Sequence, residues 1–456
     1  MLDDTIAAVA TPLGEGGLAV IRLSGPEALA VADRSFAPAG EASVKPSAAA
    51  THTIHFGHVV RDGQTVDEAL LAVMRAPRTF TREDVVEITC HGGILAAKLV
   101  LDTVLANGAR LAEPGEFTRR AFLNGRIDLA QAEAVADLIH SRTELALRAA
   151  NEQLAGKLSQ RINKLRDQML ETLAHVEAHI DFPEEDIAPD TLEQLIARLQ
   201  NGVAFMDELL RTAHEGQILR RGIRAAIIGR PNAGKSSLLN QLLGHDRAIV
   251  SAIPGTTRDT IAETANIRGL PVVFIDTAGL REARDELELE GVRRSRQTLQ
   301  EAEFILHVFD AAEPLTDADE KHLAEFAGKK RILVRNKVDL PLRLHFPPDL
   351  KGPVVDVSCL TGQGIEPLKD AMKELAWSGE IRAEMLQVMI NSRHQEALNR
   401  ARAATLSTLA ALKENQTLEL VALDLRIAVN AVGEIVGQTT TEDLLDIIFS
   451  QFCIGK

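Results

Sequence analysis

A glycine-rich segment in the middle of the chain has the residue types and spacing of a phosphate-binding loop. The segment GRPNAGKS, from Gly229 to Ser236, matches G-x-x-x-x-G-K-[ST] and lies between the apolar run AAII and the helical sequence SSLLNQLL. Glycines let backbone N–H groups approach phosphate oxygens, while Lys235 neutralises phosphate charge and Ser236 offers a ligand to Mg²⁺. The predicted phosphate contacts are Gly229, Asn232, Ala233, Gly234, Lys235, Ser236 and Ser237.

Three later motifs follow apolar runs, and their order favours guanine over adenine. They are DTAG with Asp276 and Gly279, NKVD with Asn336, Lys337 and Asp339, and SCL with Ser358 and Cys359. The carboxylate of Asp339 can accept both N–H donors on the edge of guanine, which adenine does not present. The SCL motif departs from the commoner S-A-[KL] form, so we expect its backbone to make the contact. These motifs predict GTP binding and hydrolysis.

The loop that would close over the nucleotide carries two threonines, and one usual catalytic group is missing. Thr256 and Thr257 lie in PGTTRDT, where Thr257 would complete the Mg²⁺ shell. The residue after DTAG is Leu280, where Ras-like enzymes carry the glutamine that orients the attacking water. Another group must orient the water, and the acidic segment 282–290 is the nearest supply of hydrogen-bond acceptors.

The elements that must position these residues alternate between strand-like and helical patterns. Five apolar runs separated by helical sequence indicate a mostly parallel sheet covered by helices. Residues 1–118 read as an α+β domain, and three- and four-residue spacing of apolar side chains predicts an all-α domain on both sides of the sheet. The prediction is a multidomain α/β chain in which residues 217–378 are inserted between helical parts 119–216 and 379–456. The Ala/Pro/Ser/Gly-rich stretch 37–50 is expected to form a surface loop.

Composition limits the class of protein and its partners. The chain has 456 residues, of which 45% are hydrophobic and 25% charged, the balance of an ordinary globular protein. A net charge of -15 argues against tight non-specific binding of nucleic acid. Three cysteines without a CxxC pair suggest neither a disulfide framework nor a zinc site. Without a secretory signal or an apolar run of about 18 residues, a cytoplasmic location is expected.

Longer motifs along the whole chain resemble the MnmE (TrmE) family of tRNA-modification GTPases. They are DTIAAVATPLGEGG, IRLSG, EDVVEITCHGG, PGEFTRRAFLNGRIDLAQAEAVADLI and the terminal FCIGK, besides GRPNAGKSSLLN and PGTTRDT. The resemblance implies an N-terminal domain that dimerises and binds 5-formyl- or methylene-tetrahydrofolate, a helical domain, and an inserted Ras-like P-loop G domain that dimerises with GTP and K⁺. It also implies a flavoprotein partner, MnmG (GidA), with which an aminomethyl or carboxymethylaminomethyl group is installed at C5 of the wobble uridine of certain tRNAs.

The resemblance also assigns roles to individual residues. The catalytic residues would be Glu288, which orients the water, with Lys235 and Asn232. The K⁺ site would comprise Asn232, Ser251, Ile253 and Thr256, and the Mg²⁺ ligands Ser236 and Thr257. The folate contacts would be Arg22, Glu87, Arg126 and Lys456.

Simpler roles remain open for several of these side chains. Glu288 could be a solvated helix charge, and Arg22 and Arg126 could be surface cations. Cys453 could be a reactive thiol at the folate pocket or a buried apolar side chain. The segment from Thr440 to Lys456 is predicted to be a docked amphipathic helix that completes the folate site.

Two other functions share part of the pattern. A ribosome-assembly or RNA-binding switch GTPase would carry the same phosphate loop, usually with a basic RNA-binding domain. A folate-dependent transferase that is only regulated by its G domain would have the same sequence features as this chain outside residues 217–378.

Overall fold

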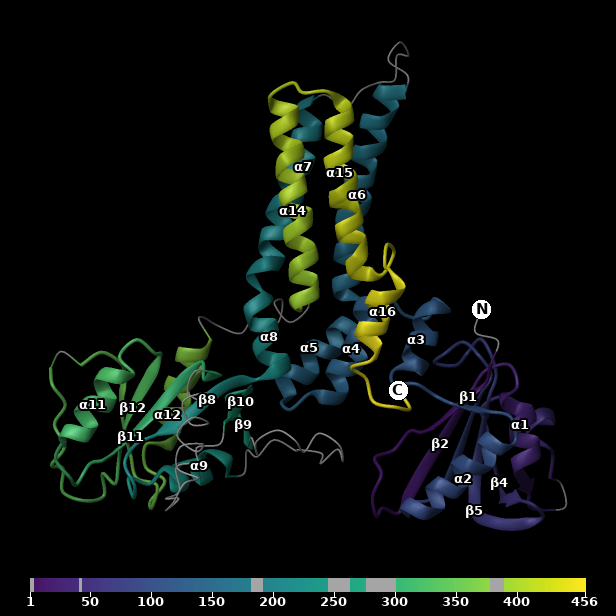
Figure 1. Cartoon of the computed structure of the whole chain (residues 1–456), viewed down its shortest axis with the longest axis horizontal. Coiled ribbons are helices and arrows are strands. Elements are labelled where there is room, and N and C mark those ends of the chain that lie inside the picture. Colours follow the sequence, from purple (N-terminus) through teal and green to yellow (C-terminus); the bar gives the residue numbers. More distant parts are fainter. Residues whose placement is uncertain are drawn as a thin grey trace, which may run out of the picture. The chain divides into compact units, whose positions relative to one another are not determined.

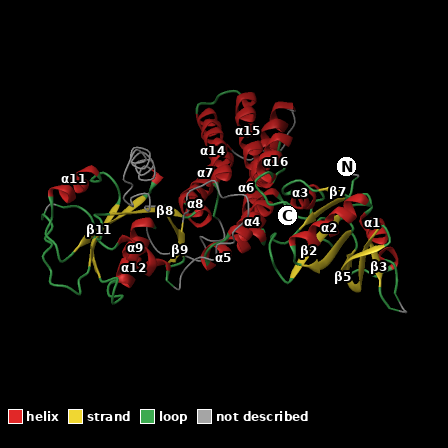
Figure 2. Ribbon diagram, turned by 60° about the horizontal axis from the view of Figure 1, so that its bottom comes forward, coloured by secondary structure: helices red, strands yellow, loops and turns green. Residues whose placement is uncertain are grey.

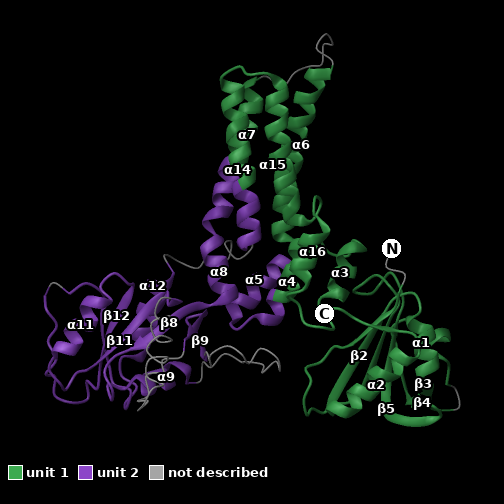
Figure 3. Cartoon of the chain, in the orientation of Figure 1, with its two compact units in different colours: residues 1–136, 154–202, 400–456 green, residues 137–153, 203–399 purple. Residues whose placement is uncertain are grey.

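A computed structural model describes residues 4–40, 43–181, 192–244, 263–275, 301–348, 350–377 and 389–456 (Figures 1 and 2). These residues form two compact units (Figure 3). The first comprises 1–136, 154–202 and 400–456, and the second 137–153 and 203–399. No helix within the described ranges combines the length and apolar character that crossing a membrane requires.

The first unit contains a seven-stranded sheet with the order β3-β4-β5-β6-β2-β1-β7. All neighbours are antiparallel except β1 and β7. The strands are β1 (Ile6–Val9), β2 (Leu18–Ser24), β3 (Phe36–Pro38), β4 (Thr53–Arg61), β5 (Gln64–Met74), β6 (Val85–His91) and β7 (Arg110–Leu111).

Helices cover one face of this sheet and leave part of the other open. Side chains of alternating strand positions point to one face and form a core with α1 (Ala28–Ser35) and α2 (Ile94–Ala106), as a strand period of two requires. On the opposite face, Ile54, Phe56 and Leu70 are 70%, 48% and 45% exposed. The sheet therefore presents an apolar surface that nothing in the described residues covers.

The helical part of the first unit is elongated, and α6 (Lys157–Asp181) packs along α15 (Leu418–Val436) (Figure 1). Buried residues of α15 recur at helical spacing, and Arg426 pairs with Glu177 at 2.7 Å between Nε and Oε1. The remaining helices of this region are α3 (Glu116–Leu123), α4 (Leu129–His140), α7 (Leu192–Arg211), α14 (Ser392–Lys413) and α16 (Glu442–Phe449), of which α4, α7 and α14 continue into the second unit.

The second unit is built on a six-stranded sheet with the order β13-β12-β11-β8-β10-β9. Every pair is parallel except β9 and β10. The strands are β8 (Ile223–Ile228), β9 (Glu263–Ile267), β10 (Leu270–Phe274), β11 (Phe304–Asp310), β12 (Arg331–Asn336) and β13 (Val354–Val357). The helices are α5 (Glu144–Leu154), α8 (Ala213–Arg221), α9 (Lys235–Leu243), α11 (Asp317–Glu325) and α12 (Ile365–Ala376).

Helix α5 contributes to the hydrophobic core of this second sheet. Ala146 and Ala149 belong to the same buried cluster as strands β8 to β13. A Cβ placed on Gly269, in the turn between β9 and β10, would lie 3.6 Å from Leu145. Arg142 donates from Nη1 to Oγ1 of Thr264 at 2.7 Å. The segment between α4 and α5 is thus bound to β9 by both apolar and polar contacts.

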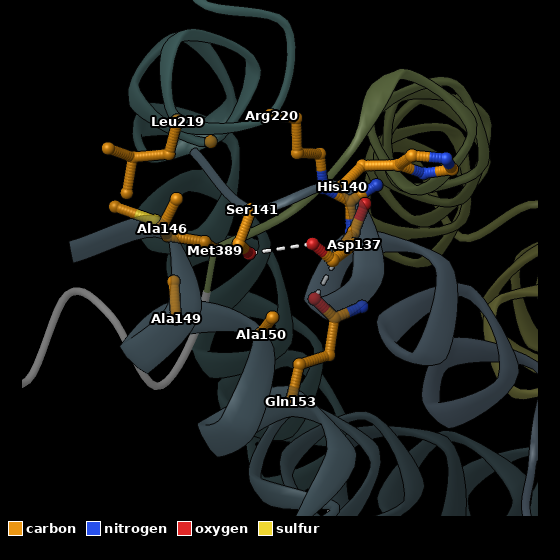
Figure 4. Close-up of a pocket in the computed structure, with 11 residues that line it drawn as sticks. Asp137, His140, Ser141, Ala146, Ala149, Ala150, Gln153, Leu219, Arg220 and Met389 are labelled. Atoms are coloured by element: carbon orange, nitrogen blue, oxygen red, sulfur yellow. Dashed lines mark hydrogen bonds and ion pairs between the residues drawn. The ribbon is translucent and has the colours of Figure 1, made fainter. Parts of the chain in front are cut away.

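Helix α8 leads directly into β8 and is held against α4 and α5 by one arginine (Figure 4). Arg220 Nη2 lies 2.5 Å from Oδ2 of Asp137 and donates to Oε1 of Gln153 at 3.1 Å. A cavity of about 30 Å³ lies among these side chains, enough space for a water molecule. Because Gln153 is 5% exposed, its pairing with Arg220 avoids leaving a buried amide oxygen without a donor.

The multidomain α/β fold predicted from the sequence is confirmed, and the five predicted strands are β8, β10, β11, β12 and β13 of the six-stranded second sheet. Within the stretch 37–50, where a surface loop was expected, Pro46–Ala48 forms a 3₁₀ turn and Ser47 N–H donates to Asp33 Oδ1 at 2.8 Å. The C-terminal amphipathic helix is present but ends at Phe449, and seven further residues continue as turns. The boundaries 118, 216 and 378 stay a prediction.

Candidate functional site

The predicted phosphate loop joins the carboxyl end of β8 to the first turn of α9. Gly234 precedes α9 in the left-handed conformation with φ +93, and no side chain among the described residues caps the helix. A Cβ at Gly234 would lie 2.1 Å from Nδ2 of Asn336, so only glycine fits. The first N–H groups of α9 are consequently open to an anion, as phosphate binding at a helix N-terminus requires.

The ammonium of Lys235 is already turned toward this loop. Its Nζ donates to the carbonyl oxygens of Gly229 at 2.9 Å and Arg230 at 2.8 Å. Burial lowers the pKa of Lys235 below its usual range. A phosphate anion would replace neutral carbonyl groups with a stronger acceptor and stabilise the charged form of this lysine.

Asn336 holds the phosphate loop and the SCL loop together. Its Nδ2 donates to Ala233 O at 2.9 Å, and its Oδ1 accepts from Cys359 N–H at 3.1 Å. Asp339 Oδ1 accepts from Ser358 Oγ at 2.5 Å. These bonds orient the exposed Asp339 carboxylate while Ser358 is itself fully buried.

The phosphate loop and the two downstream loops line one cavity of about 670 Å³. This volume lies within the usual range for sites that bind a small molecule. Cys359 lines this cavity. Burial and the nearby Asp339 charge raise the pKa of Cys359 to about 11, so its thiol is uncharged at neutral pH. The lining residues are Asn232, Gly234, Lys235, Ser236, Ser237, Asn336, Lys337, Asp339, Leu340, Cys359 and Leu360.

The remaining predicted residues of this site lie outside the described residues. They are Ser251, Ile253, Thr256, Thr257, Asp276, Gly279 and Glu288. Among the described residues, Ser236 on α9 supplies the hydroxyl oxygen that suits Mg²⁺, and Asn232 in the loop supplies an amide oxygen that suits K⁺. The donor types present therefore fit the predicted cations.

A second group of predicted residues meets at the open face of the seven-stranded sheet. Arg22 on β2 stands opposite Glu87 on β6 in the register, with 2.7 Å between Nε and Oε1. Arg22 Nη1 also donates to Gly455 O at 3.2 Å, and its guanidinium lies 5.8 Å from the ring centre of Phe117. The two side chains are 25% and 29% exposed, so a ligand can reach them.

The C-terminal turn is fixed beside this ion pair. Ile454 forms a bridge with Pro114, and Gly115 N–H donates to Cys453 O at 3.4 Å. Phe449 and Phe452 are buried against α3 and α4, which explains why the tail docks. The structure thus brings Arg22, Glu87 and the last turn together.

Arg126 and Lys456 are less closely integrated. Arg126 is exposed in the turn after α3, and its backbone N–H donates to Ala121 O at 2.8 Å. Within the described ranges no hydrogen bond or ion pair joins the Arg126 side chain to Arg22 or Glu87. Lys456 N–H donates to Cys453 O at 3.3 Å, which places Lys456 in the docked turn.

Sequence reasoning missed Leu340 as a lining residue and Asp310 as a partner of Lys337. Leu340 directly follows the NKVD motif and is 46% exposed at the cavity. Asp310 ends β11, and the carboxyl end of a parallel strand is where ligand-binding residues gather. Its position in FILHVFD was therefore the available signal.

Comparisons with known proteins cover nearly the whole chain. Residues 5–126 match the model of the GTP-binding protein TrmE N-terminus, and residues 129–453 match the MnmE helical domain. The tRNA modification GTPase MnmE of Geobacillus kaustophilus is 50% identical over 99% of both chains. That of Bacillus subtilis is 46% identical over 99% of this chain and all of its own.

A solved structure of an Aquifex aeolicus Era variant bound to GDP and AlF₄⁻ is 30% identical and covers 40% of this chain and 66% of its own, with a TM-score of 0.27. The full-length identity and the two family models, together with the geometry above, establish that the chain belongs to the tRNA modification GTPase MnmE family.

Proposed function

We propose that this chain is a Mg²⁺- and K⁺-dependent GTPase that acts with the flavoprotein MnmG to modify the wobble uridine of certain tRNAs, using a reduced-folate one-carbon donor. The GTPase part rests on one observation above all. Lys235 follows β8, Asn336 and Asp339 stand at the end of β12, and all three line one cavity that can contain a nucleotide. Membership of the MnmE family supports the tRNA substrate and a cytoplasmic location.

Each described side chain of the cavity has a definite task in this proposal. Lys235 and the first turn of α9 bind the phosphates, and Ser236 holds Mg²⁺, which neutralises phosphate charge when bound. Asp339 accepts from the guanine edge. Asn336 keeps the phosphate and base loops in register through Ala233 and Cys359.

The catalytic part of the proposal extends to residues outside the described ranges. Glu288 would orient the attacking water, and Asn232 with Ser251, Ile253 and Thr256 would hold K⁺. A cation at that position stabilises negative charge that develops between the phosphates, the task that an arginine finger performs in other GTPases.

The folate site is proposed at Arg22, Glu87 and the C-terminal turn, with Arg126 and Lys456 as further cationic contacts. A reduced folate carries glutamyl carboxylates and a pterin with several N–H donors. Arg22 could bind a carboxylate, and Glu87 could accept from the pterin. The hydrogen bond from Arg22 to Gly455 O supports a role for the tail in this site.

A homodimer is proposed through the open face of the seven-stranded sheet. Phe56 lies opposite Leu70 in the register of β4 and β5, and both are exposed beside Ile54. A second copy would remove this apolar surface from water. Sedimentation of Phe56→Asp should give a smaller species than the wild type, while Leu95→Asp, at an exposed site on α2, should not.

The decisive experiment is mass analysis of tRNA wobble nucleosides from cells that lack this chain. The modified uridine should disappear and return with the wild-type chain or with Lys321→Ala, a change of an exposed lysine on α11. It should not return with Lys235→Ala. Unchanged wobble nucleosides together with a ribosome-assembly defect would favour the alternative GTPase function.

Two further variants separate hydrolysis from folate binding. Glu288→Ala should bind GTP but fail to restore the modification, and full restoration would mean that the G domain only regulates a folate transferase. Removal of residues 453–456 should weaken binding of 5-formyltetrahydrofolate and leave GTP turnover near the wild-type rate. Unchanged folate affinity would leave the tail as a packing element.

A further inference from the structure

The ammonium of Lys337, in the predicted guanine-binding motif, has a carboxylate partner outside that motif. Its Nζ lies 2.5 Å from Oδ2 of Asp310, and the two side chains are 34% and 11% exposed. Lys337 is among the described residues that line the nucleotide cavity, whereas Asp310 is not. The Asp310 side chain therefore reaches the cavity through its ion pair with Lys337.

The backbone fixes Asp310 firmly in this position. Asp310 stands opposite Asn336 in the parallel register of β11 and β12, and Ala311 N–H donates to Asn336 O at 2.8 Å. One carboxylate oxygen, Oδ1, accepts from Ala312 N–H at 2.9 Å. The other oxygen, Oδ2, is thereby directed to Lys337. The carboxylate is oriented by the strand end and does not depend on the flexible lysine.

Lys337 needs such a partner because its local conformation is unfavourable. It is a non-glycine residue with φ +66, in the left-handed region, directly after β12. Such conformations persist where the surroundings over-determine them. Val338 N–H donates to Val357 O at 3.2 Å and holds the backbone, while the ion pair holds the far end of the side chain.

We propose that Asp310 is a positioning residue for the guanine nucleotide. It binds the Lys337 ammonium so that the lysine's methylene stem forms one wall of the base pocket, and the charged end stays out of the space that the base occupies. This inference rests on the proposed GTPase function. A lysine stem is flexible and its ammonium strongly hydrated, so without the carboxylate the side chain samples positions that obstruct or leave the pocket.

The test compares two carboxylate-to-amide changes on β11 and β13, the two strands that flank β12. Asp310→Asn removes the partner of Lys337. Asp356→Asn removes the partner of Arg335, a pair with 2.5 Å between Nε and Oδ1 that lies outside the described lining of the cavity. GDP affinity is measured by calorimetry, and kcat and KM for GTP are measured by phosphate release.

We expect Asp310→Asn to weaken GDP binding about tenfold, equivalent to about 1.4 kcal/mol, and to raise KM far more than it lowers kcat. Asp356→Asn should bind GDP as the wild type does. Asp310→Glu keeps the charge but moves it by one methylene, so its affinity should lie between those of the wild type and Asp310→Asn.

A double variant shows whether Asp310 acts through the lysine. Asp310→Asn combined with Lys337→Met should bind GDP no more weakly than Lys337→Met alone. Additive losses, or wild-type affinity in Asp310→Asn, would overturn the inference. If Asp310→Asn does not fold, Asp310→Glu carries the test, and wild-type affinity in it likewise overturns the inference. Absence of GDP binding by the wild-type chain would instead refute the proposed GTPase.

Discussion

Replacing Gly455 by alanine tests whether the docked tail belongs to the folate site without changing the length or charge of the chain. Gly455 has φ +93, and a Cβ there would lie 2.5 Å from Val9 O and 3.1 Å from Ala10 Cα. Val9 is held in β1 opposite Ile21, inside the sheet. The strand cannot move easily, so the last turn must shift.

The expected size of the effect follows from these contacts. An alanine in the left-handed region costs about 1–2 kcal/mol. Movement of the turn would also lose the 3.2 Å hydrogen bond from Arg22 Nη1 to Gly455 O, worth about 1 kcal/mol net. A total of about 2–3 kcal/mol corresponds to a fall of roughly 30- to 150-fold in the equilibrium constant for docking of the turn.

The assay is calorimetric titration with 5-formyltetrahydrofolate. We expect Gly455→Ala to bind at least about tenfold more weakly, because the apparent affinity falls with the fraction of molecules whose last turn is docked. The control is Gly328→Ala, where a Cβ meets no atom within 4 Å. Both variants should hydrolyse GTP at the wild-type rate. Wild-type folate affinity in Gly455→Ala would refute a role for the turn.

Three further predictions concern the second unit. Replacing potassium by sodium at equal ionic strength should slow GTP turnover severalfold, because Asn232 is expected to ligate K⁺; equal rates would exclude the cation from the mechanism. Glu288→Ala should retain GTP affinity and lose roughly 10²-fold in turnover, whereas lost affinity with normal turnover would indicate a structural residue. Burial lowers the pKa of His307 to about 3, while the unfolded state binds a proton near the ordinary pKa of 6.5. The free energy of unfolding should therefore fall as the pH drops from 7 toward 3. His307→Phe should reduce that fall when the melting temperature is measured against pH, and an unchanged pH profile would contradict the lowered pKa of His307.

Local sequence was sufficient to predict the phosphate side of the nucleotide site. GRPNAGKS sets the loop, the start of α9 and the positions of Lys235 and Ser236 within one continuous segment. The guanine side was predicted because NKVD and SCL each follow an apolar run, and parallel strands bring their carboxyl ends to one edge. Strand β9 was missed because an antiparallel edge strand of five residues has too little pattern to distinguish it from a loop.

Contacts between distant segments could not be predicted from the pattern of residues. The pairing of Arg22 with Glu87 depends on the register of β2 and β6, and both strands alternate in a way compatible with other registers. The bond between Arg22 and Gly455 joins residues 433 positions apart. The family resemblance assigned Arg22, Glu87 and the C-terminal residues to one site. Hydrophobic periodicity alone could only predict that the C-terminal helix packs against the rest of the chain.

The packing of α5 on the second sheet limits how the nucleotide-binding module can be moved between proteins. Ala146 and Ala149 belong to the core of that sheet, although about 75 positions separate them from β8 in the sequence. A transplanted cassette cut at residues 217 and 378 would leave them behind, together with Leu145, which packs against the same core and lies beside the turn at Gly269. Recombination at those points would be selected against unless the recipient supplied an equivalent helix. The host helices and the module should therefore have been inherited together as one unit.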